Sequence, residues 1–201
     1  MVKTILLLRH GETALNRSGA LRGQLEVALS DNGIREAQQL ARRIQAEYRV
    51  SAICSSPRLR ARATADEVAR ATGLTIDIDE HFNDLDYGPW TGRTSDSFSP
   101  QEQTEFQHWQ RHPEQPLPTA EDPSIAQRRA VSGLDAQAAA HEGCIAIVSH
   151  DAILQLILCE ILSIDLQSYR GLVQHTSTLN ELERTANGWR VHLLNSIWHL
   201  S

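Results

Sequence analysis

The chain is poor in cysteine, and the arrangement of the cysteines excludes a disulfide scaffold. There are three among 201 residues, an odd number, widely spaced in apolar stretches and without a C-x-x-C pair. Such cysteines are typical of buried, reduced thiols in a cytoplasmic protein rather than of a catalytic thiol. They are Cys54, Cys144 and Cys159.

Long hydrophobic runs and an excess of positive charge are also absent. No apolar stretch is long enough to span a bilayer, and the hydrophobic patch at the start of the chain stops at Arg9, before a signal-peptide core could form. The net charge of −6 disfavours a general nucleic-acid or membrane-surface binder. We therefore expect a cytoplasmic protein with no nucleic-acid partner and no membrane partner.

What the sequence does contain is an alternation of strand and helix patterns. Residues 2–8, which end in an apolar run, and the fully apolar run at 144–148 are typical of central strands, and Asn187-Gly188 is a strong hairpin signal. Further strands are expected at 50–54, 75–79, 177–183 and 189–194, and helices from Ser30 or Asp31 to about Ala46 and at 57–71, 101–111, 124–141 and 152–162. The pattern predicts a three-layer α/β/α sandwich with a mostly parallel central sheet, in a single domain over 1–201.

Two segments depart from this alternation. The polar segment 11–30 is longer than the roughly two to six residues that usually join a strand to a helix. The segment 84–123 is rich in Pro, Ser, Gln and Glu and has few aliphatic residues. Long connections at strand ends tend to carry function, so we expect 91–123 to be a lid or insertion over the active face. In the helix after Ser30, one face is expected to be buried: Ile34, Ala37, Leu40, Ala41 and Ile44.

Residues suited to phosphoryl chemistry stand at the predicted strand ends. Arg9 and His10 follow the first strand, Arg60 lies early in the helix after the second, and His150 follows the run 144–148. Any one of these alone is more often a surface, core or capping residue. A phosphoryl group, however, needs several donors that converge from different segments, and strand ends of an α/β sheet bring such groups together. Gly11 is expected to let the backbone approach the ligand closely.

The motifs around these residues resemble those of the histidine phosphatase superfamily, in the branch that includes the cofactor-dependent phosphoglycerate mutases. The resemblance rests on Arg9-His10-Gly11-Glu12-Thr13 with Asn16, on Ser55-Ser56 with Arg60-Ala61 and Thr64-Ala65, and on Val148-Ser149-His150. It covers residues 3 to 180. It implies a phosphoglycerate mutase-like fold, His10 as the nucleophile, Arg9 and Arg60 as phosphate-binding residues, His150 in contact with the transferring group and Asn16 in the phosphate pocket. It also implies that no metal and no cofactor is needed.

The resemblance extends to an acidic segment and includes departures from the family pattern. Asp84 stands where the family has its proton donor, which is glutamate in many members, and Asp86 is the alternative acid. Ala20 stands where many members carry an arginine. Either Arg22, two positions later, takes the place of that arginine, or the arginine is simply lost. Thr13 either touches the phosphate or only forms a turn, and Glu121 is expected in the substrate pocket. Asp151 stands where glycine is frequent, and we expect it to cap the following helix with its charge turned away.

We interpret the chain as a metal-independent phosphomonoesterase that forms a phosphohistidine and acts on a small phosphorylated metabolite. One alternative is a phosphoglycerate mutase, and another is a non-catalytic phosphate-binding module. A zinc site at His108 and His112 is disfavoured, because the glutamate of the metalloprotease motif is missing. The substrate remains open, and a homodimer formed through the terminal strands is possible.

Overall fold

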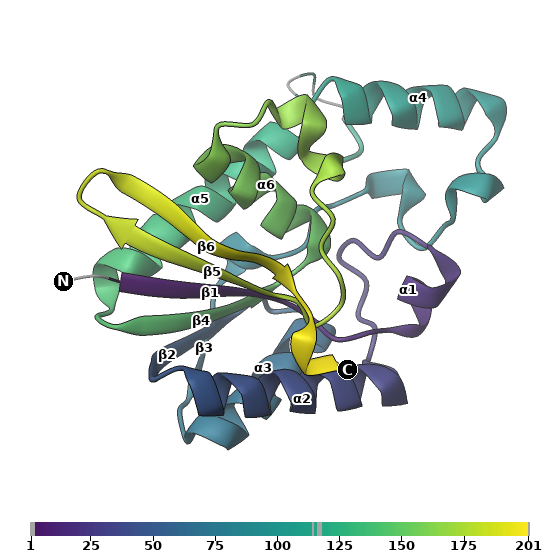
Figure 1. Ribbon diagram of the computed structural model, residues 1–201. Helices are drawn as coiled ribbons and strands as arrows, with labels where there is room; N and C mark the ends of the chain where they lie inside the picture. The colour runs from purple at the N-terminus through teal and green to yellow at the C-terminus, as the bar shows by residue number, and fades with distance from the viewer. Residues whose placement is uncertain (1–2, 114, 116–117, 201) are drawn as a thin grey trace.

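Six strands form one mixed sheet in the order β3-β2-β4-β1-β5-β6 (Figure 1). The computed structural model describes residues 3–113, 115 and 118–200. The strands are β1 (Lys3–Arg9), β2 (Val50–Ser55), β3 (Ile76–Ile78), β4 (Cys144–Ser149), β5 (Leu179–Thr185) and β6 (Gly188–Ser196). The helices are α1 (Ala14–Ser18), α2 (Asp31–Glu47), α3 (Leu59–Thr72), α4 (Pro100–Arg111), α5 (Pro123–Ala140) and α6 (Asp151–Leu162).

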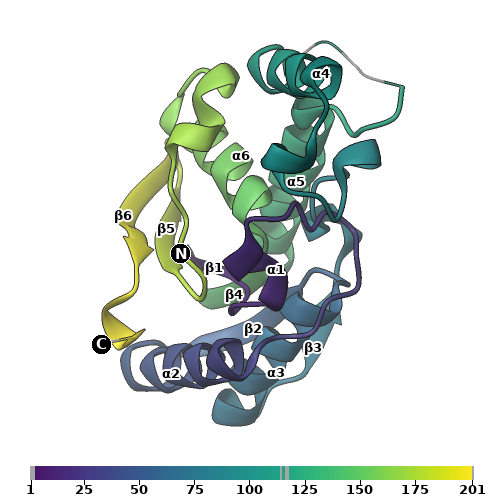
Figure 2. The same cartoon turned by 90° about the vertical axis from the view of Figure 1, so that its right-hand side faces the viewer.

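The sheet is parallel from β3 to β1 and antiparallel at the β5–β6 edge. Helices α2 and α3 cover one face, and α5 and α6 cover the other (Figures 1 and 2). The predicted three-layer α/β/α architecture with a mostly parallel sheet is therefore confirmed. The predicted hairpin at Asn187-Gly188 is confirmed as well, since β6 begins at Gly188 and returns antiparallel to β5.

Alternating side chains of the central strands build a separate hydrophobic core on each face. From β1, Ile5 and Leu7 join the core with α5 and α6, while Leu6 and Leu8 join the core with α2 and α3. All four are fully buried, because a central parallel strand has helices on both faces. The rigid strands β1 and β4 thus fix the positions of the residues that follow them.

The segment between β1 and α2 contains structure that the sequence did not predict. Residues 14–18 form the short helix α1, and Thr13 and Asn16 cap it reciprocally. Helix α2 begins at Asp31 with Ser30 as its N-cap, because the Ser30 Oγ accepts from the Gly33 N–H. The predicted buried face of α2 is correct for Ala37, Leu40, Ala41 and Ile44 but wrong for Ile34, which lies in the first turn of the helix and is 41% exposed.

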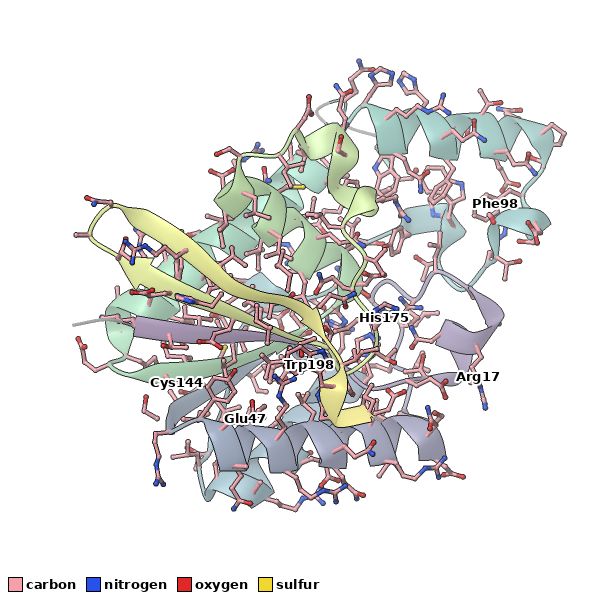
Figure 3. All side chains as sticks on the ribbon, in the orientation of Figure 1. Arg17, Glu47, Phe98, Cys144, His175 and Trp198 are labelled. Atoms are coloured by element: carbon pink, nitrogen blue, oxygen red, sulfur yellow. The ribbon has the colours of Figure 1, made fainter. Side chains whose placement is uncertain are left out.

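The predicted lid segment 91–123 contains helix α4, and aromatic side chains from this segment and from residues 87–90 form a cluster with it. Phe98 points towards α4 and meets Phe106, whose ring centroid is 5.3 Å away (Figure 3). Trp90 packs edge-on against Phe106 at 4.9 Å. Tyr87 and Trp109 complete the cluster. This aromatic packing supplies the apolar contacts that the polar sequence of the segment lacks, and its role as a lid stays a prediction.

All three cysteines are free and buried, as expected. Among the residues that the structure describes, no helix is both long enough and apolar enough to cross a bilayer.

Candidate active site

Three parallel strands end at the same edge of the sheet and bring the candidate residues together. Arg9 pairs in register with Ser149, so that His10 and His150 follow neighbouring strand ends. Ser56 follows β2 on the other side of β4, and its N–H donates to the Val148 carbonyl. The ring centroids of His10 and His150 are 5.3 Å apart, although the residues are far apart in the chain.

The hydrogen bonds of His10 leave its Nε2 atom available. Its Nδ1 lies 2.7 Å from the Gly11 carbonyl oxygen, which can only accept, so the proton is on Nδ1. Nε2 then carries a lone pair, and it is buried without a partner. Burial, followed by the charges of Arg60, Arg9 and Arg22, holds the pKa of His10 well below its ordinary value. The ring is therefore neutral near pH 7, as a nucleophilic imidazole must be.

In His150 the two ring nitrogens exchange places: Nε2 is bonded within the protein, and Nδ1 has no hydrogen-bond partner. Its Nε2 lies 2.7 Å from Ser56 Oγ, which also accepts from the Arg58 N–H and so has its own proton free to donate to Nε2. We assign the His150 proton to Nδ1, because this buried atom lies 3.6 Å from the acceptor Asp84 Oδ2 while Nε2 has the hydroxyl as a donor. Burial and neighbouring cationic groups, first Arg60, also hold the pKa of His150 well below its ordinary value. His150 thus presents a neutral N–H donor beside the neutral His10 ring, whose Nε2 has a free lone pair.

Arg60 is fully buried at the start of α3 and links the site to two loops. It donates to the carbonyls of Leu25 and Gly23 at 2.8 and 2.7 Å and to Asp84 Oδ2 at 2.7 Å. Asp84 is 3% exposed and so lies inside the site, within reach of both Arg60 and His150. Asp86, the alternative acid, instead accepts from the Gly88 N–H of its own turn at 2.8 Å.

Arg9 and Arg22 add two more guanidinium groups. Arg9 Nη1 donates to the Gln174 carbonyl and lies 3.7 Å from Asp151 Oδ2. Arg22 Nη1 donates to the Ala20 carbonyl at 3.4 Å, and its charge acts on both histidines. Arg22 therefore lies near the site, two positions after Ala20, the residue that stands where many family members have an arginine.

The unpaired polar atoms of the molecule gather at this place. Among the described residues, eight buried side-chain nitrogen and oxygen atoms have no partner, and five of them belong to the candidate site. The five are Arg9 Nε, His10 Nε2, Arg22 Nε, Arg60 Nε and His150 Nδ1. Buried polar atoms are almost always hydrogen-bonded in folded proteins, so a cluster of exceptions marks a place built for a ligand.

Gly11 is needed for the close packing of two protein segments. A Cβ atom at Gly11 would lie 2.4 Å from the Gly33 carbonyl oxygen, and one at Gly33 would lie 2.0 Å from the Glu12 carbonyl oxygen. The Gly11 N–H donates to Thr64 Oγ1 at 3.0 Å. The glycine thus lets the loop after β1 lie against the backbone of α2, and its expected approach to a ligand stays a prediction.

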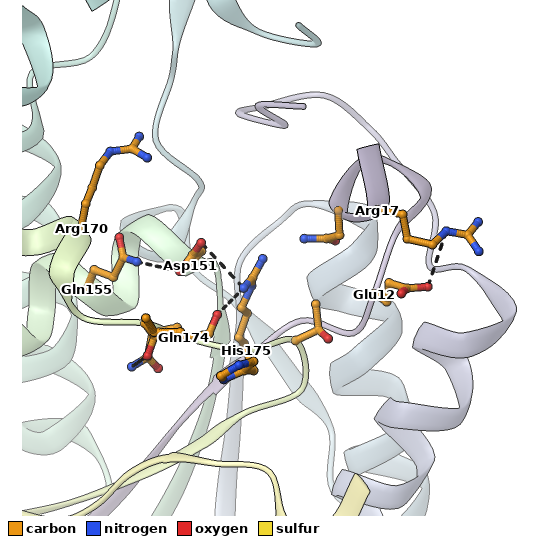
Figure 4. A pocket seen from close by; sticks show the side chains of 11 residues that line it. Glu12, Arg17, Asp151, Gln155, Arg170, Gln174 and His175 are labelled. Atoms are coloured by element: carbon orange, nitrogen blue, oxygen red, sulfur yellow. Dashed lines mark hydrogen bonds and ion pairs between the residues drawn. The ribbon is translucent and has the colours of Figure 1, made fainter. Parts of the chain in front are cut away.

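A cavity of about 510 Å³ opens beside Arg9 (Figure 4). Its lining residues come from the start of the chain and from the segments around α6: Arg9, Glu12, Asn16, Arg17, Asp151, Gln155, Arg170, Val173, Gln174, His175 and Thr176. His10 and His150, exposed by 0% and 1%, are not among them. The cavity therefore adjoins the cluster of imidazole and guanidinium groups through Arg9.

Three expectations from the sequence change with the structure. Thr13 Oγ1 donates to Asn16 Oδ1 at 2.8 Å, so its hydroxyl serves the cap of α1. Both carboxylate oxygens of Glu121 accept from Arg129, at 2.7 and 2.9 Å, which ties Glu121 to α5. The expected orientation of Asp151 is wrong. His150, not Asp151, occupies the N-cap position of α6. The Asp151 carboxylate faces Arg9, whose positive charge attracts it.

Two residues of the site were not assigned a role from the sequence. Ser56 orients His150, and the only indication of this in the sequence was its place in the motif that contains Arg60. Gln174 holds Arg9 through a backbone carbonyl, which no side-chain pattern can reveal. Among the described residues, no group of three or more His, Cys, Asp or Glu side chains is arranged to hold a metal ion, and His108 Nε2 bonds to Gln115 at 2.9 Å.

Known proteins similar to this chain share one family. The sequence pattern of the histidine phosphatase superfamily, branch 1, matches residues 5–197. The chain is 28% identical to phosphoserine phosphatase 1 of Hydrogenobacter thermophilus, over 84% of this chain and 80% of that protein. It is 28% identical to a protein named probable phosphoglycerate mutase GpmB, of Serratia proteamaculans, over 98% of this chain and 94% of that protein.

The fold agrees with that family as well. Among solved structures, YhfR of Bacillus stearothermophilus superposes on this chain with a TM-score of 0.91, covers 99% of this chain and 100% of its own, and is 25% identical in sequence. The predicted family is therefore confirmed over nearly the whole chain: the protein belongs to branch 1 of the histidine phosphatase superfamily.

Proposed function

We propose that this protein is a metal-independent phosphomonoesterase that hydrolyses small phosphorylated metabolites in two phosphoryl-transfer steps. The single observation that carries the proposal is the cluster of five unpartnered buried atoms on two imidazoles and three guanidinium groups. A phosphoryl group has several charged oxygens and one electrophilic phosphorus, and so it matches a set of donors around one lone pair.

In the first step, His10 Nε2 attacks the phosphorus atom while the bond from phosphorus to the ester oxygen breaks. The carboxyl group of Asp84 gives its proton to the departing alcohol. In the second step a water molecule attacks the phosphohistidine, its proton passes to Asp84, and the bond from phosphorus to nitrogen breaks. The tautomer fixed by the Gly11 carbonyl presents the nucleophilic lone pair without a separate base.

The remaining site residues hold the phosphoryl oxygens. Arg9 and Arg60 supply charge on two sides, His150 donates through Nδ1, and Arg22 takes the part of the arginine absent at position 20. Asn16 lines the cavity beside Arg9 and contacts the phosphoryl end of the substrate. Thr13 positions Asn16 through its hydroxyl, and Glu121 holds the acidic segment by accepting from the Asp86 N–H at 3.2 Å.

The proposal is tested with p-nitrophenyl phosphate and the variant His10→Ala. The wild-type protein is expected to release phosphate and, when quenched with alkali during turnover, to retain an acid-labile phosphoryl label. Removal of the nucleophile should abolish the label and lower kcat by about 10⁴-fold or more. Loss of the label with unchanged turnover would contradict the phosphohistidine route, and absence of turnover on a panel of phosphomonoesters would favour a non-catalytic phosphate-binding module.

A phosphoglycerate mutase would use the same first step but would return the phosphoryl group to a bound intermediate. Chain length does not separate the two activities, since relatives of similar length carry both names. Incubation with 3-phosphoglycerate and a bisphosphate primer does separate them. Free phosphate is the expected product, and isomerised phosphoglycerate without free phosphate would identify a mutase.

A further inference from the structure

The guanidinium group of Arg9 rests against the segment that leads into β5. Its Nη1 donates to the Gln174 carbonyl oxygen, a bond that the dashed line at Gln174 marks in Figure 4. The Asp151 carboxylate is 3.7 Å away, too far for a hydrogen bond. Residues 172–178 lie between the 3-10 helix η4 (Leu166–Gly171) and β5 and belong to neither. The orientation of Arg9 therefore depends on what holds this segment.

One peptide group of the segment connects Arg9 to β6. The Gln174 carbonyl and the His175 N–H belong to the same planar trans unit, so they point in opposite directions. The carbonyl accepts from Arg9, and the N–H donates to Asn195 Oδ1 at 2.8 Å. Because the unit is rigid, the side chain of Asn195 sets the direction in which the carbonyl faces Arg9.

The backbone of β6 is shaped at Asn195 to reach this peptide group. Asn195 has a φ of 48°, in the left-handed region that asparagine tolerates better than most residues. Its Nδ2 lies 2.8 Å from His175 Nδ1, so the amide contacts both the backbone and the ring of His175. Two bonds to one residue fix the orientation of the amide.

A second asparagine ties Asn195 and Gln174 to the centre of the sheet. Asn180 of β5 is fully buried, and its Oδ1 accepts from the Asn195 N–H at 2.8 Å. Its Nδ2 donates to Gln174 Oε1 at 2.7 Å and to the Leu7 carbonyl of β1 at 3.1 Å. Both amide protons of Asn180 are thus used, and a buried network whose members are paired is rigid.

We propose that Asn195 is a positioning residue for Arg9, with Asn180 as its anchor. The two asparagines hold the peptide group whose carbonyl orients the guanidinium group, although neither of them lines the cavity beside Arg9. The inference rests on the proposed function, in which Arg9 binds phosphoryl oxygens. A long arginine side chain that is held in advance loses less entropy when the anion binds, so the β5–β6 edge of the sheet contributes to phosphate affinity.

The inference is tested with two substitutions that tolerate the left-handed backbone. Asn195→Gly removes the acceptor for the His175 N–H, whereas Asn195→Asp keeps it. We expect Asn195→Gly to raise the Kd of vanadate, an analogue of phosphate, about 10-fold in titration calorimetry, as the loss of one hydrogen bond allows. Asn195→Asp should retain most of the affinity. Asn187→Gly, at the exposed turn of the same hairpin, is the matched control and should leave the Kd unchanged.

The dependence on Arg9 is measured with a double-mutant cycle. In the Arg9→Met background, Asn195→Gly should change the Kd of vanadate less than about twofold, because no guanidinium group is left to position. Gln174→Met, which removes the acceptor of Asn180 Nδ2, should also weaken binding only when Arg9 is present, and it replaces Asn195→Gly if that variant does not fold. A Kd that is unchanged in these variants, or that rises equally with and without Arg9, would overturn the inference.

Hydrolysis of p-nitrophenyl phosphate by the same variants separates this inference from the proposed function. We expect kcat/KM to fall in parallel with the affinity for vanadate. Hydrolysis without coupling between Asn195 and Arg9 would refute the positioning role alone. Coupling in vanadate binding without hydrolysis of any phosphoester would refute the phosphomonoesterase activity alone.

Discussion

At the scale of single residues, two histidines of the same site acquire different chemistry from one hydrogen bond each. The Gly11 carbonyl can only accept, and this fixes the His10 proton on Nδ1. The Ser56 hydroxyl accepts from the Arg58 N–H and can donate to His150 Nε2, which leaves the His150 proton on Nδ1. One ring therefore presents a lone pair and the other presents a donor, although both are neutral.

Removal of the Ser56 hydroxyl should disturb only the second ring. In Ser56→Ala, His150 loses the donor to Nε2, and the tautomer that presents Nδ1–H is no longer favoured. We expect kcat/KM for p-nitrophenyl phosphate to fall about 10- to 100-fold, the worth of the proposed hydrogen bond from His150 Nδ1 to the charged phosphoryl group. Ser56→Thr, which keeps a hydroxyl, should retain most of the activity. The ¹⁵N chemical shifts of the imidazoles report the tautomers directly, and an unchanged His150 spectrum in Ser56→Ala would contradict the assignment.

The role of Asp84 depends on how much the leaving alcohol needs a proton. Asp84→Asn should lower kcat for an alkyl phosphate by about 10²- to 10⁴-fold, because an alkoxide is a poor leaving group. The same change should matter far less for p-nitrophenyl phosphate, because p-nitrophenolate leaves without protonation. Asp86→Asn is the matched control, since that carboxylate bonds within its own turn. Equal losses on both substrates would mean that Asp84 serves only to orient Arg60.

At the scale of elements, the loop after β1 is held where two backbones touch. Gly33 stands in the first turn of α2, and alanine there would normally favour the helix. Here, however, a Cβ atom would lie 2.0 Å from the Glu12 carbonyl oxygen, a backbone atom that cannot swing aside. For Gly33→Ala, packing thus predicts a loss of stability, whereas helix propensity predicts a gain.

We expect packing to decide the outcome. Gly33→Ala should lower the free energy of unfolding by about 1–3 kcal/mol, measured by urea denaturation, and should also lower kcat because the loop that bears His10 moves. Gly171→Ala is the control, because a Cβ atom there meets nothing within 4 Å. Its stability should stay within about 0.5 kcal/mol of the wild type. A stabilised Gly33→Ala protein would show that the loop can move away without cost.

The elements that could be predicted from the sequence are those whose own residues dictate them. β1 and β4 contain the apolar runs 5–8 and 144–148, and α2 has both a cap and a periodic face. α1 was missed because its five residues are too few to show a helical period and none of them is buried. Asp151 was misoriented because its partner, Arg9, lies on a different strand. Motifs predicted which residues meet, whereas the partners that orient them depend on tertiary structure.

At the scale of the whole molecule, the sheet order places three strand ends and two loops around a buried cluster of cationic and polar groups. Such a cluster opposes folding until an anion occupies it, because guanidinium groups and imidazoles are removed from water without full compensation. Binding of a phosphate analogue to the folded state should therefore raise stability by mass action. At one hundred times its Kd, vanadate should add about 2.7 kcal/mol to the free energy of unfolding.

The vanadate prediction is measured by urea denaturation at fixed pH with increasing vanadate. The stabilisation should be lost in Arg60→Met, which removes a buried guanidinium group, and kept in Arg128→Met, which changes an exposed one. Equal stabilisation of both variants would place the anion elsewhere on the protein.

The two buried imidazoles also make the stability of the whole molecule depend on pH. His10 and His150 have pKa values well below the ordinary 6.5 in the folded state, chiefly because of burial. Below pH 6.5 the unfolded chain therefore binds protons that the folded protein does not, and acid favours unfolding. The contribution of the two neutral rings to the free energy of unfolding is fully present above pH 6.5. It declines as the pH falls, by up to about 1.4 kcal/mol per pH unit for each ring.

This dependence is measured as the free energy of unfolding in urea between pH 7.5 and 5.5, a range in which ordinary carboxyl groups stay ionised. The wild type should lose stability steadily below pH 6.5. In His150→Gln one of the two fully buried rings is gone, so the slope should become shallower, whereas His192→Gln, which removes a histidine from the exposed side of β6, should keep the wild-type slope. A wild-type stability that is flat over this range would mean that the folded and the unfolded protein bind equal numbers of protons, and burial would then not lower the pKa of either imidazole.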